Sequence, residues 1–194
     1  MRYFELTVDR DLSNPVQVQR LDTQVYKNGV TKEDFDAIRQ LQVAYFDHTE
    51  QTEICDVLWE PAFMVSDALR RVFLLYEPEM EFKGVQLFAD DLEDQTSPLY
   101  WMPYIEPVGC MGEGSSKYPN GMLEKLVLDS DAPVGRRHIF RVADILEHKI
   151  IISLPVAESM IRRQMTGAAL KPVAFCGPGA GSGKEGASCQ TRNI

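Results

Sequence analysis

The sequence predicts an α+β fold in which a mixed or mostly antiparallel sheet is covered by a few helices. Segments that alternate apolar and polar residues outnumber those with helical spacing, and the predicted strands mostly follow one another along the chain. The 44% hydrophobic and 25% charged fractions are typical of a globular protein. We predict one α+β domain over residues 1–175, or two similar lobes at about 1–95 and 96–175, and a flexible glycine-rich tail at 176–194.

The N-terminal segments predict two strands and a short helix. "RYFELTV" carries an apolar side chain at every second residue, which is the period of a half-buried strand. "PVQVQRL" repeats the alternation weakly, so we expect it to pair with the first strand. Thr31 to Asp34 resembles a capping box, with Asp34 in place of the preferred Glu, and predicts a helix over Lys32–Gln40.

A strand–helix–strand unit is predicted in "VLWEPAFMVSDALRRVFLLYEPEMEFKGVQLF". The first strand ends at Val65, and Ser66 is the N-cap of the helix. The inward-facing helical positions at i, i+3, i+4 and i+7 are Leu69, Val72, Phe73 and Tyr76. Glu77-Pro78 ends the helix, because the residue before a proline disfavours the α conformation. "EFKGVQLF" follows as the second strand.

A second unit of the same kind is predicted in "HKIIISLPVAESMIRRQMTGAALKPVAF". Its strand covers Ile150 to Ile152, Ser153 is the N-cap, and Pro155 lies in the first helical turn. Inward positions are predicted at Ala157, Met160, Ile161 and either Gln164 or Met165. Gly167 is the predicted helix stop, and residues 168–175 form the next strand. The two units are variants of one pattern, either through internal duplication or because this order of elements is common.

The segment between the two units predicts strands joined by a loop. "SPLYWMPYIEPVGCM" is followed by the loop "GEGSSKYPNG" and by two strands, "MLEKLVLD" and "HIFRVAD". The aromatic residues Tyr100, Trp101 and Tyr104 cluster here. Core packing is the default role for such side chains, and the alternative is a partner-binding edge, because Trp and Tyr are common interface anchors.

The charge is distributed unevenly along the chain. Of the net charge of −9, residues 1–94 carry 20 acidic and 9 basic side chains, and the segment 77–94 has seven acids and one lysine. Such a surface repels nucleic acid and attracts basic proteins by long-range steering. We predict that Asp90, Asp91, Glu93 and Asp94 draw in a basic protein partner; a solvated loop that only maintains solubility is the alternative.

No motif in the sequence specifies a reaction, a cofactor or a metal. "CGPGAGSGKEG" resembles a phosphate-binding loop, but Pro178 and Glu185 replace the glycine and the hydroxyl residue that such a loop requires. The histidines have no metal-ligand spacing, and the four cysteines form no C-x-x-C pair. We expect free thiols, with a Cys176–Cys189 disulfide as the alternative. The N-terminus lacks a hydrophobic signal and no apolar stretch is long enough to span a membrane, so we expect a cytoplasmic protein.

Taken in order, the two units, "LYWMPYIEPVGCM" and "LEKLVLDSDAPVGRRHIFRV" resemble a family of bacterial immunity proteins from polymorphic toxin systems, formerly a domain of unknown function. The resemblance spans about residues 54–175 and consists of hydrophobic patterns with a serine-capped helix near each end. It implies a non-enzymatic protein that binds and blocks a cognate toxin inside the producing cell, with no catalytic residues. The alternatives are a hydrolase assembled from distant residues, such as Ser115 or a histidine with a carboxylate, and a small-ligand sensor.

Overall fold

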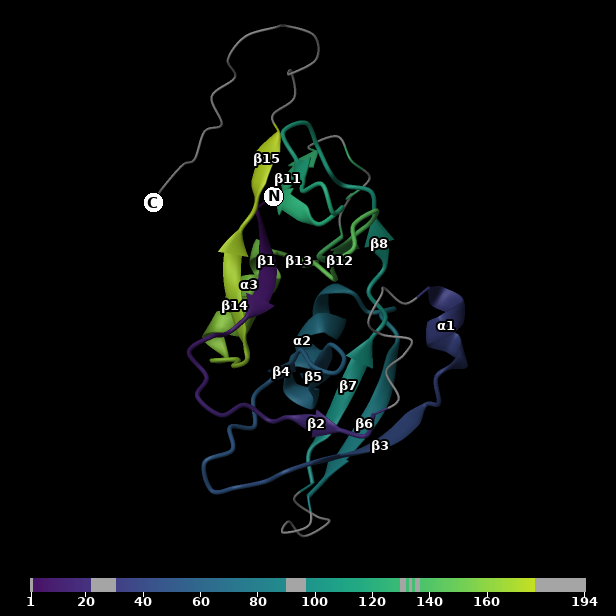
Figure 1. The fold of residues 1–194 in the computed structure, drawn as a ribbon, viewed down its shortest axis with the longest axis vertical. Coiled ribbons are helices and arrows are strands. Elements are labelled where there is room, and N and C mark those ends of the chain that lie inside the picture. The colour runs from purple at the N-terminus through teal and green to yellow at the C-terminus, as the bar shows by residue number, and fades with distance from the viewer. Residues whose placement is uncertain are drawn as a thin grey trace, which may run out of the picture.

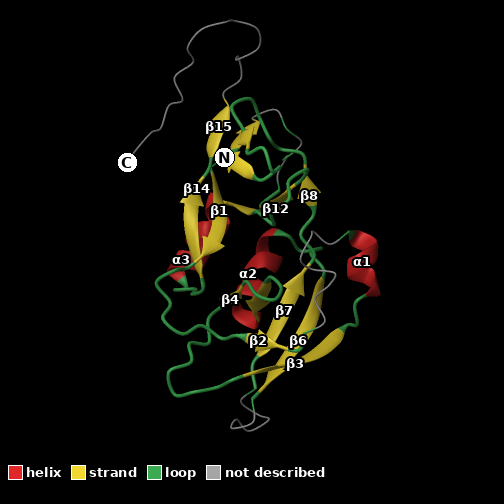
Figure 2. Cartoon of the chain, viewed as in Figure 1, coloured by secondary structure: helices red, strands yellow, loops and turns green. Residues whose placement is uncertain are grey.

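The described part of the chain consists mostly of strands in mixed sheets, with three helices, so the predicted α+β class is confirmed (Figure 2). The computed structural model describes residues 2–21, 31–89, 97–129, 132, 134 and 137–176. The helices are α1 (Lys32–Ala37), α2 (Asp67–Tyr76) and α3 (Leu154–Arg162). No helix in these ranges is both long and apolar enough to cross a bilayer.

The larger sheet has six strands and lies in the lower half of Figure 1. In spatial order they are β2 (Val18–Gln19), β3 (Leu41–Phe46), β6 (Phe82–Phe88), β7 (Leu99–Pro103), β5 (Met64–Ser66) and β4 (Val57–Leu58). The β3–β6 pair is parallel and the other pairs are antiparallel. Because β5 and β6 both run antiparallel to β7, they are parallel to each other, with α2 as the crossover between them.

The smaller sheet has five strands and lies above the larger one in Figure 1. In spatial order they are β14 (Ala168–Pro172), β1 (Tyr3–Val8), β13 (Ile150–Ser153), β12 (Ile139–Val142) and β8 (Pro107–Val108). Two further pairs complete the described part of the chain: β9 (Ser116–Lys117) with β10 (Leu123–Lys125), and β11 (Val127–Asp129) with β15 (Ala174–Cys176). Cys176, the first residue of the predicted tail, is the last residue of β15, and residues 177–194 lie outside the described residues, so the tail stays a prediction.

The two sheets contain the same four-strand arrangement. In the larger sheet four strands lie in the order β6-β7-β5-β4, and α2 connects β5 to β6. In the smaller sheet four strands lie in the order β14-β1-β13-β12, and α3 connects β13 to β14. All neighbouring pairs in both sets are antiparallel. The two predicted strand–helix–strand units are therefore present with matching topology. Their origin by duplication and the division into two lobes stay predictions.

One hydrophobic core joins the two sheets through the two longer helices. Helices α2 and α3 contact each other. The fully buried residues of this core come from both helices and both sheets: Val65, Leu69, Phe73, Ile150, Ile152 and Val156. The Tyr76 hydroxyl lies 2.7 Å from Ser159 Oγ and donates to the Pro155 carbonyl at 3.0 Å, which links α2 to α3. The two units are thus packed as one body.

The N-terminal strand pairs differently from our prediction. β1 lies between β13 and β14, and the segment expected to pair with it forms β2, which pairs with β3 instead. β1 supplies the middle strand of the C-terminal unit, so its partners are about 150 residues away in the chain. β3 was not among the predicted strands, and the first helix, predicted to extend to Gln40, ends at Ala37.

Helix α3 differs from its predicted form in two details. Ser153 is the N-cap residue, but its side chain makes no capping hydrogen bond. Ile161, predicted to face inward, is 64% exposed, while Val156 is fully buried in its place. The helix ends at Arg162, where Gln164 adopts the left-handed conformation with φ 54°, so Gly167 is not the stop.

Gly167 instead allows a close contact between the two units. Its φ is +90°, and an added Cβ would lie 2.3 Å from the Val57 carbonyl oxygen. The Trp59 indole N–H donates to the Gly167 carbonyl at 2.8 Å, and the Val57 N–H donates to the Thr166 carbonyl at 3.1 Å. The backbone of the second unit therefore rests directly on β4 of the first.

Candidate functional site

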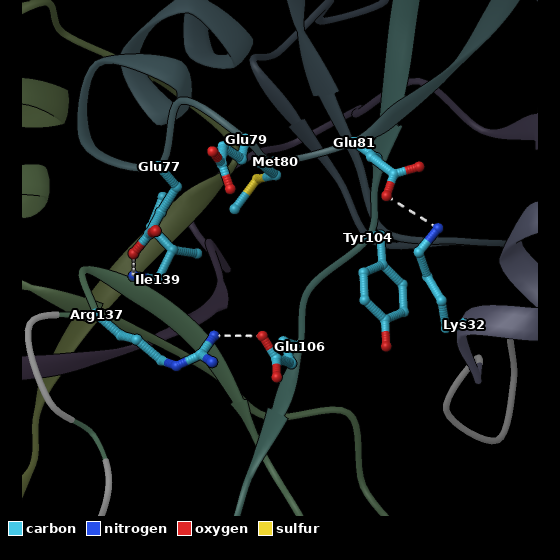
Figure 3. A pocket seen from close by; sticks show the side chains of 9 residues that line it. All are labelled: Lys32, Glu77, Glu79, Met80, Glu81, Tyr104, Glu106, Arg137 and Ile139. Carbon is cyan, nitrogen blue, oxygen red and sulfur yellow. Dashed lines mark hydrogen bonds and ion pairs between the residues drawn. The ribbon is translucent and has the colours of Figure 1, made fainter.

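An open acidic groove of about 590 Å³ lies between α1, the loop from α2 to β6, and β12 (Figure 3). Its lining side chains come from four separate parts of the chain: Lys32, Glu77, Glu79, Met80, Glu81, Tyr104, Glu106, Arg137 and Ile139. Four carboxylates face two cations among these residues. The groove contains the first three acids of the acidic segment that the sequence analysis identified.

Both cations of the groove are held by ion pairs. Lys32 Nζ lies 2.9 Å from Glu81 Oε1 and also pairs with Asp36 one helical turn along α1. These two carboxylates raise the pKa of the Lys32 ammonium, chiefly through hydrogen bonds from it, so it stays charged. Arg137 pairs with Glu106 across the groove (Figure 3). The positive charges are therefore already neutralised by part of the acidic lining.

The remaining two carboxylates have different surroundings. Glu77, at the end of α2, accepts the backbone N–H groups of His138 and Ile139 at 2.6 and 3.3 Å, which fixes β12 beside the helix. Glu79 is exposed and is drawn without a partner in Figure 3. Among the exposed carboxylates of the groove, Glu79 is therefore the one that does not pair with Lys32 or Arg137, and it lies next to the half-buried residue Met80.

Tyr104 forms an aromatic wall of the groove. Its ring packs against Phe35 of α1 with centroids 5.4 Å apart, and Lys32 Nζ lies 5.6 Å from the ring centroid. Partial burial, and then the charge of Glu106, raise the pKa of the Tyr104 hydroxyl, so it remains a neutral donor. The structure thus brings a predicted anchor residue together with the first part of the acidic segment.

The other two aromatic candidates are placed in the interior and beside α2. Tyr100 is 1% exposed and its hydroxyl donates to the Cys55 carbonyl at 2.6 Å; burial raises the pKa of this hydroxyl well above its ordinary value. Its side chain therefore has no surface on which a partner could bind. Trp101 is half-buried, and the Arg70 guanidinium lies 4.1 Å from its ring centroid, which is a cation–π distance.

The four acids predicted to steer a partner, Asp90, Asp91, Glu93 and Asp94, lie outside the described residues. Their role stays a prediction. Conversely, Lys32, Glu106 and Arg137 line the groove but were not predicted as members of a site. These three residues are more than 30 residues apart from one another in the chain, and no local motif marks them. Only the packing of α1 and β12 against the α2–β6 loop brings them together.

A half-buried histidine beside a buried serine resembles part of a hydrolase site. His138 Nδ1 lies 2.8 Å from Ser153 Oγ, and Glu77 is near them. Ser153 is fully buried, and Glu77 accepts backbone N–H groups rather than the imidazole N–H. A nucleophilic serine needs an open approach for its substrate and a base held by its carboxylate, and this pair has neither.

Ser115, the other candidate nucleophile, has a structural role. Its hydroxyl donates to the Val127 carbonyl at 2.9 Å and accepts the Val127 N–H at 3.0 Å, which ties the loop to β11. In the described part of the chain, no three His, Cys, Asp or Glu side chains converge as a metal site. Cys55, Cys110 and Cys176 are free thiols, and Cys189 lies outside the described residues.

Comparison with known proteins assigns the chain to a family. No curated protein matches it. The model of the Immunity protein family (Imm11) matches residues 6–174, which is most of the chain and extends well beyond the 54–175 segment that carries the sequence resemblance. The matched range begins in β1 and ends at the first residue of β15, so it includes both strand–helix–strand units and all the residues of the acidic groove. The chain belongs to the Immunity protein family (Imm11).

Proposed function

We propose that this protein neutralises a cognate toxin inside the cell that produces it, by binding a basic part of the toxin in the acidic groove. Immunity families of polymorphic toxin systems are typically non-enzymatic, and membership implies a toxin partner. The observation that supports the groove is its excess of two carboxylates around an accessible tyrosine ring. A non-enzymatic inhibitor needs a surface of this kind and no reacting groups.

The groove offers two kinds of contact to a lysine or arginine of the toxin. The Glu79 carboxylate is exposed, so it can form a charge-assisted hydrogen bond as the partner docks. The Tyr104 ring face can receive the cation or the aliphatic part of the same side chain. Burying the pair beside Met80 would exclude water and prolong the complex.

The net charge of −9 supports a basic partner on kinetic grounds. Complementary charge raises association rates at low ionic strength and has less effect on dissociation. The segment 90–94, which comes two residues after the end of β6 in the sequence, contains four further acids. We propose that this segment contributes to steering and that the groove provides the specific contacts.

The experiment begins with the tagged protein purified from cells that encode it, followed by identification of the proteins that bind it. With the captured toxin, association and dissociation rates are measured for the native chain and for Glu79→Lys. Reversing one exposed charge should lower the association rate about tenfold at low salt, and the difference should shrink as salt is added.

The matched control is Glu50→Lys, which makes the same charge change at an exposed residue in the loop after β3. Equal rates for Glu79→Lys and Glu50→Lys would refute the groove as the binding site. A captured partner whose binding shows no salt dependence would refute the electrostatic part of the proposal.

A further inference from the structure

The two strand–helix–strand units make the same backbone hydrogen bond before each helix. The Ser66 N–H donates to the Asp56 carbonyl, and the Ser153 N–H donates to the His138 carbonyl, both at 2.8 Å. Asp56 directly precedes β4, and His138 directly precedes β12. Each of these strands pairs antiparallel with the strand that ends at the serine or next to it. The first residues of β4 and β12 are therefore in equivalent positions.

The loops that follow the two helices reach the other unit at this equivalent position. The two loops have five residues each and cover 77–81 and 163–167. After α3, Thr166 accepts the N–H of Val57, the first residue of β4, at 3.1 Å. After α2, Glu77 accepts the N–H of Ile139, the first residue of β12, at 3.3 Å. Each unit thus holds one strand of the other through an acceptor in its loop.

The acceptor is a backbone group in one loop and a side chain in the other. Thr166 uses its carbonyl, so the backbone of its loop lies directly on β4, with Gly167 in close contact. Glu77 uses its carboxylate, and the same Oε1 also accepts the His138 N–H at 2.6 Å. The length of the Glu77 side chain therefore separates the loop after α2 from β12.

The backbone of the loop 77–81 is fixed within its own unit at both ends. The Glu77 N–H donates to the Phe73 carbonyl at 2.8 Å, and the Met80 N–H donates to the Glu77 carbonyl at 3.1 Å. At the other end, the Tyr104 N–H donates to the Glu81 carbonyl at 2.9 Å. Both backbone groups of Glu77 are thus in use, and its side chain makes the link to β12.

The acidic groove lies in the space that this link spans. Glu77 and Ile139 both line it, together with Glu79 and Met80 from the middle of the loop. Figure 3 shows the Glu77 side chain extending toward Ile139, with a dashed line between them. At the equivalent position beside β4, the backbone at Gly167 occupies the space instead.

We propose that Glu77 is a positioning residue whose side-chain length sets the width of the acidic groove. This inference rests on the proposed function, in which the groove binds the toxin. Glu77 acts through its length and its acceptor oxygen, because the groups that it holds are neutral backbone amides. It keeps Glu79 and Met80 at a fixed distance from β12, so the partner meets a site that is already ordered.

Two substitutions separate the length of the side chain from its charge. Glu77→Gln keeps the length and a carbonyl acceptor but removes the charge, whereas Glu77→Asp keeps the charge and is one methylene shorter. Glu77→Gln should dissociate from the captured toxin within about twofold of the native rate, and Glu77→Asp about tenfold faster. A residue that acts by attracting the toxin through its charge would give the opposite order.

Hydrogen exchange measured by NMR without the toxin tests the link itself. The His138 and Ile139 amides should exchange at native rates in Glu77→Gln and at least about fivefold faster in Glu77→Asp, because the shorter carboxylate cannot reach both amides. The matched control is Glu113→Asp, which makes the same change at an exposed residue before β9. It should match the native chain in both measurements. Circular dichroism establishes that each variant is folded at the temperature used.

The outcomes separate this inference from the proposed function. Native exchange of both amides in Glu77→Asp overturns the inference. So does a Glu77→Gln variant that dissociates as fast as Glu77→Asp, since the charge would then be what matters. If Glu79→Lys slows association relative to Glu50→Lys while Glu77→Asp keeps the native dissociation rate, the positioning role alone fails. Equal rates for Glu79→Lys and Glu50→Lys refute the groove as the binding site.

Discussion

The two strand–helix–strand units reach the same topology by different routes. In the first unit the strand between β5 and β6 is β7, which follows β6 directly in the chain. In the second unit the equivalent strand between β13 and β14 is β1, at the other end of the sequence. The first unit is thus complete within about 50 residues, whereas the second requires both ends of the matched range to meet. Contacts of this second kind carry a larger loop-closure cost.

The two helix caps show the same contrast between local and distant partners. Ser66 Oγ accepts the Leu69 N–H at 3.2 Å, so it caps the first turn of α2, and it donates to the Asp56 carboxylate at 2.6 Å. Ser153 occupies the same place before α3, but its hydroxyl contacts His138, the residue that precedes β12. Identical residues at identical positions therefore serve different neighbours.

The largest expected effect tests the contact between the units. Gly167→Ala places a methyl group against the Val57 carbonyl and forces a side chain onto a backbone with φ +90°. We expect a loss of more than about 3 kcal/mol in unfolding free energy, because β4 and the turn after α3 must move apart. Chemical denaturation measures this loss.

The matched control for that substitution is Gly109→Ala, where no atom lies within 4 Å of the added methyl group and no positive φ is involved. It should be close to neutral. Similar losses for the two glycines would show that the units do not depend on this contact.

How far the sequence predicts this fold depends on the distance between interacting residues. Ser66, the helix after it and its stop at Glu77-Pro78 follow from local patterns, and the structure confirms them. The pairing of β1 was wrong, since its alternation indicates a strand but not which strand it meets. Ile161 fits a helical stripe as well as Val156 does, and only the position of α2 decides which of them is buried.

The same distinction applies to the candidate groove. The acids at 77–81 and the aromatic cluster were visible as composition, but Lys32, Glu106 and Arg137 could not be added without the fold. Tyr100 and Tyr104 are both tyrosines in one apolar stretch, and no sequence signal separates the buried ring from the accessible one. The sequence therefore predicts that the site is acidic, whereas the packing of the fold determines which residues line it.

The second expected effect is a pH dependence of stability that only the second strand–helix–strand unit should show at this position. His148, two residues before β13, packs edge-on against Phe63, and burial together with the Arg141 charge lowers its pKa to about 4. The corresponding residue two before β5 is Ala62, which does not titrate. An unfolded histidine titrates near a pH of about 6.5, so the unfolded chain binds this proton first as pH falls.

Stability should therefore be full above about pH 6.5 and decline as the pH falls toward about 4, by up to about 3 kcal/mol from this group. His148→Gln removes the titration. Its unfolding free energy, measured by denaturation at several pH values, should depend less on pH over that window than that of the native chain. Parallel pH profiles for the two proteins would exclude His148 as the source.

The smallest expected effect is a difference in how Ser66 and Ser153 contribute to stability. Ser66→Ala should cost about 1 kcal/mol wherever it is measured, because it removes a helix cap. Ser153→Ala removes no capping bond, so its cost should come from the hydrogen bond to His138. In a double-mutant cycle the cost of Ser153→Ala should nearly vanish in a His138→Ala background, while that of Ser66→Ala should be unchanged there. A Ser153→Ala cost that is independent of His138 would mean that the serine stabilises α3 directly, as Ser66 stabilises α2.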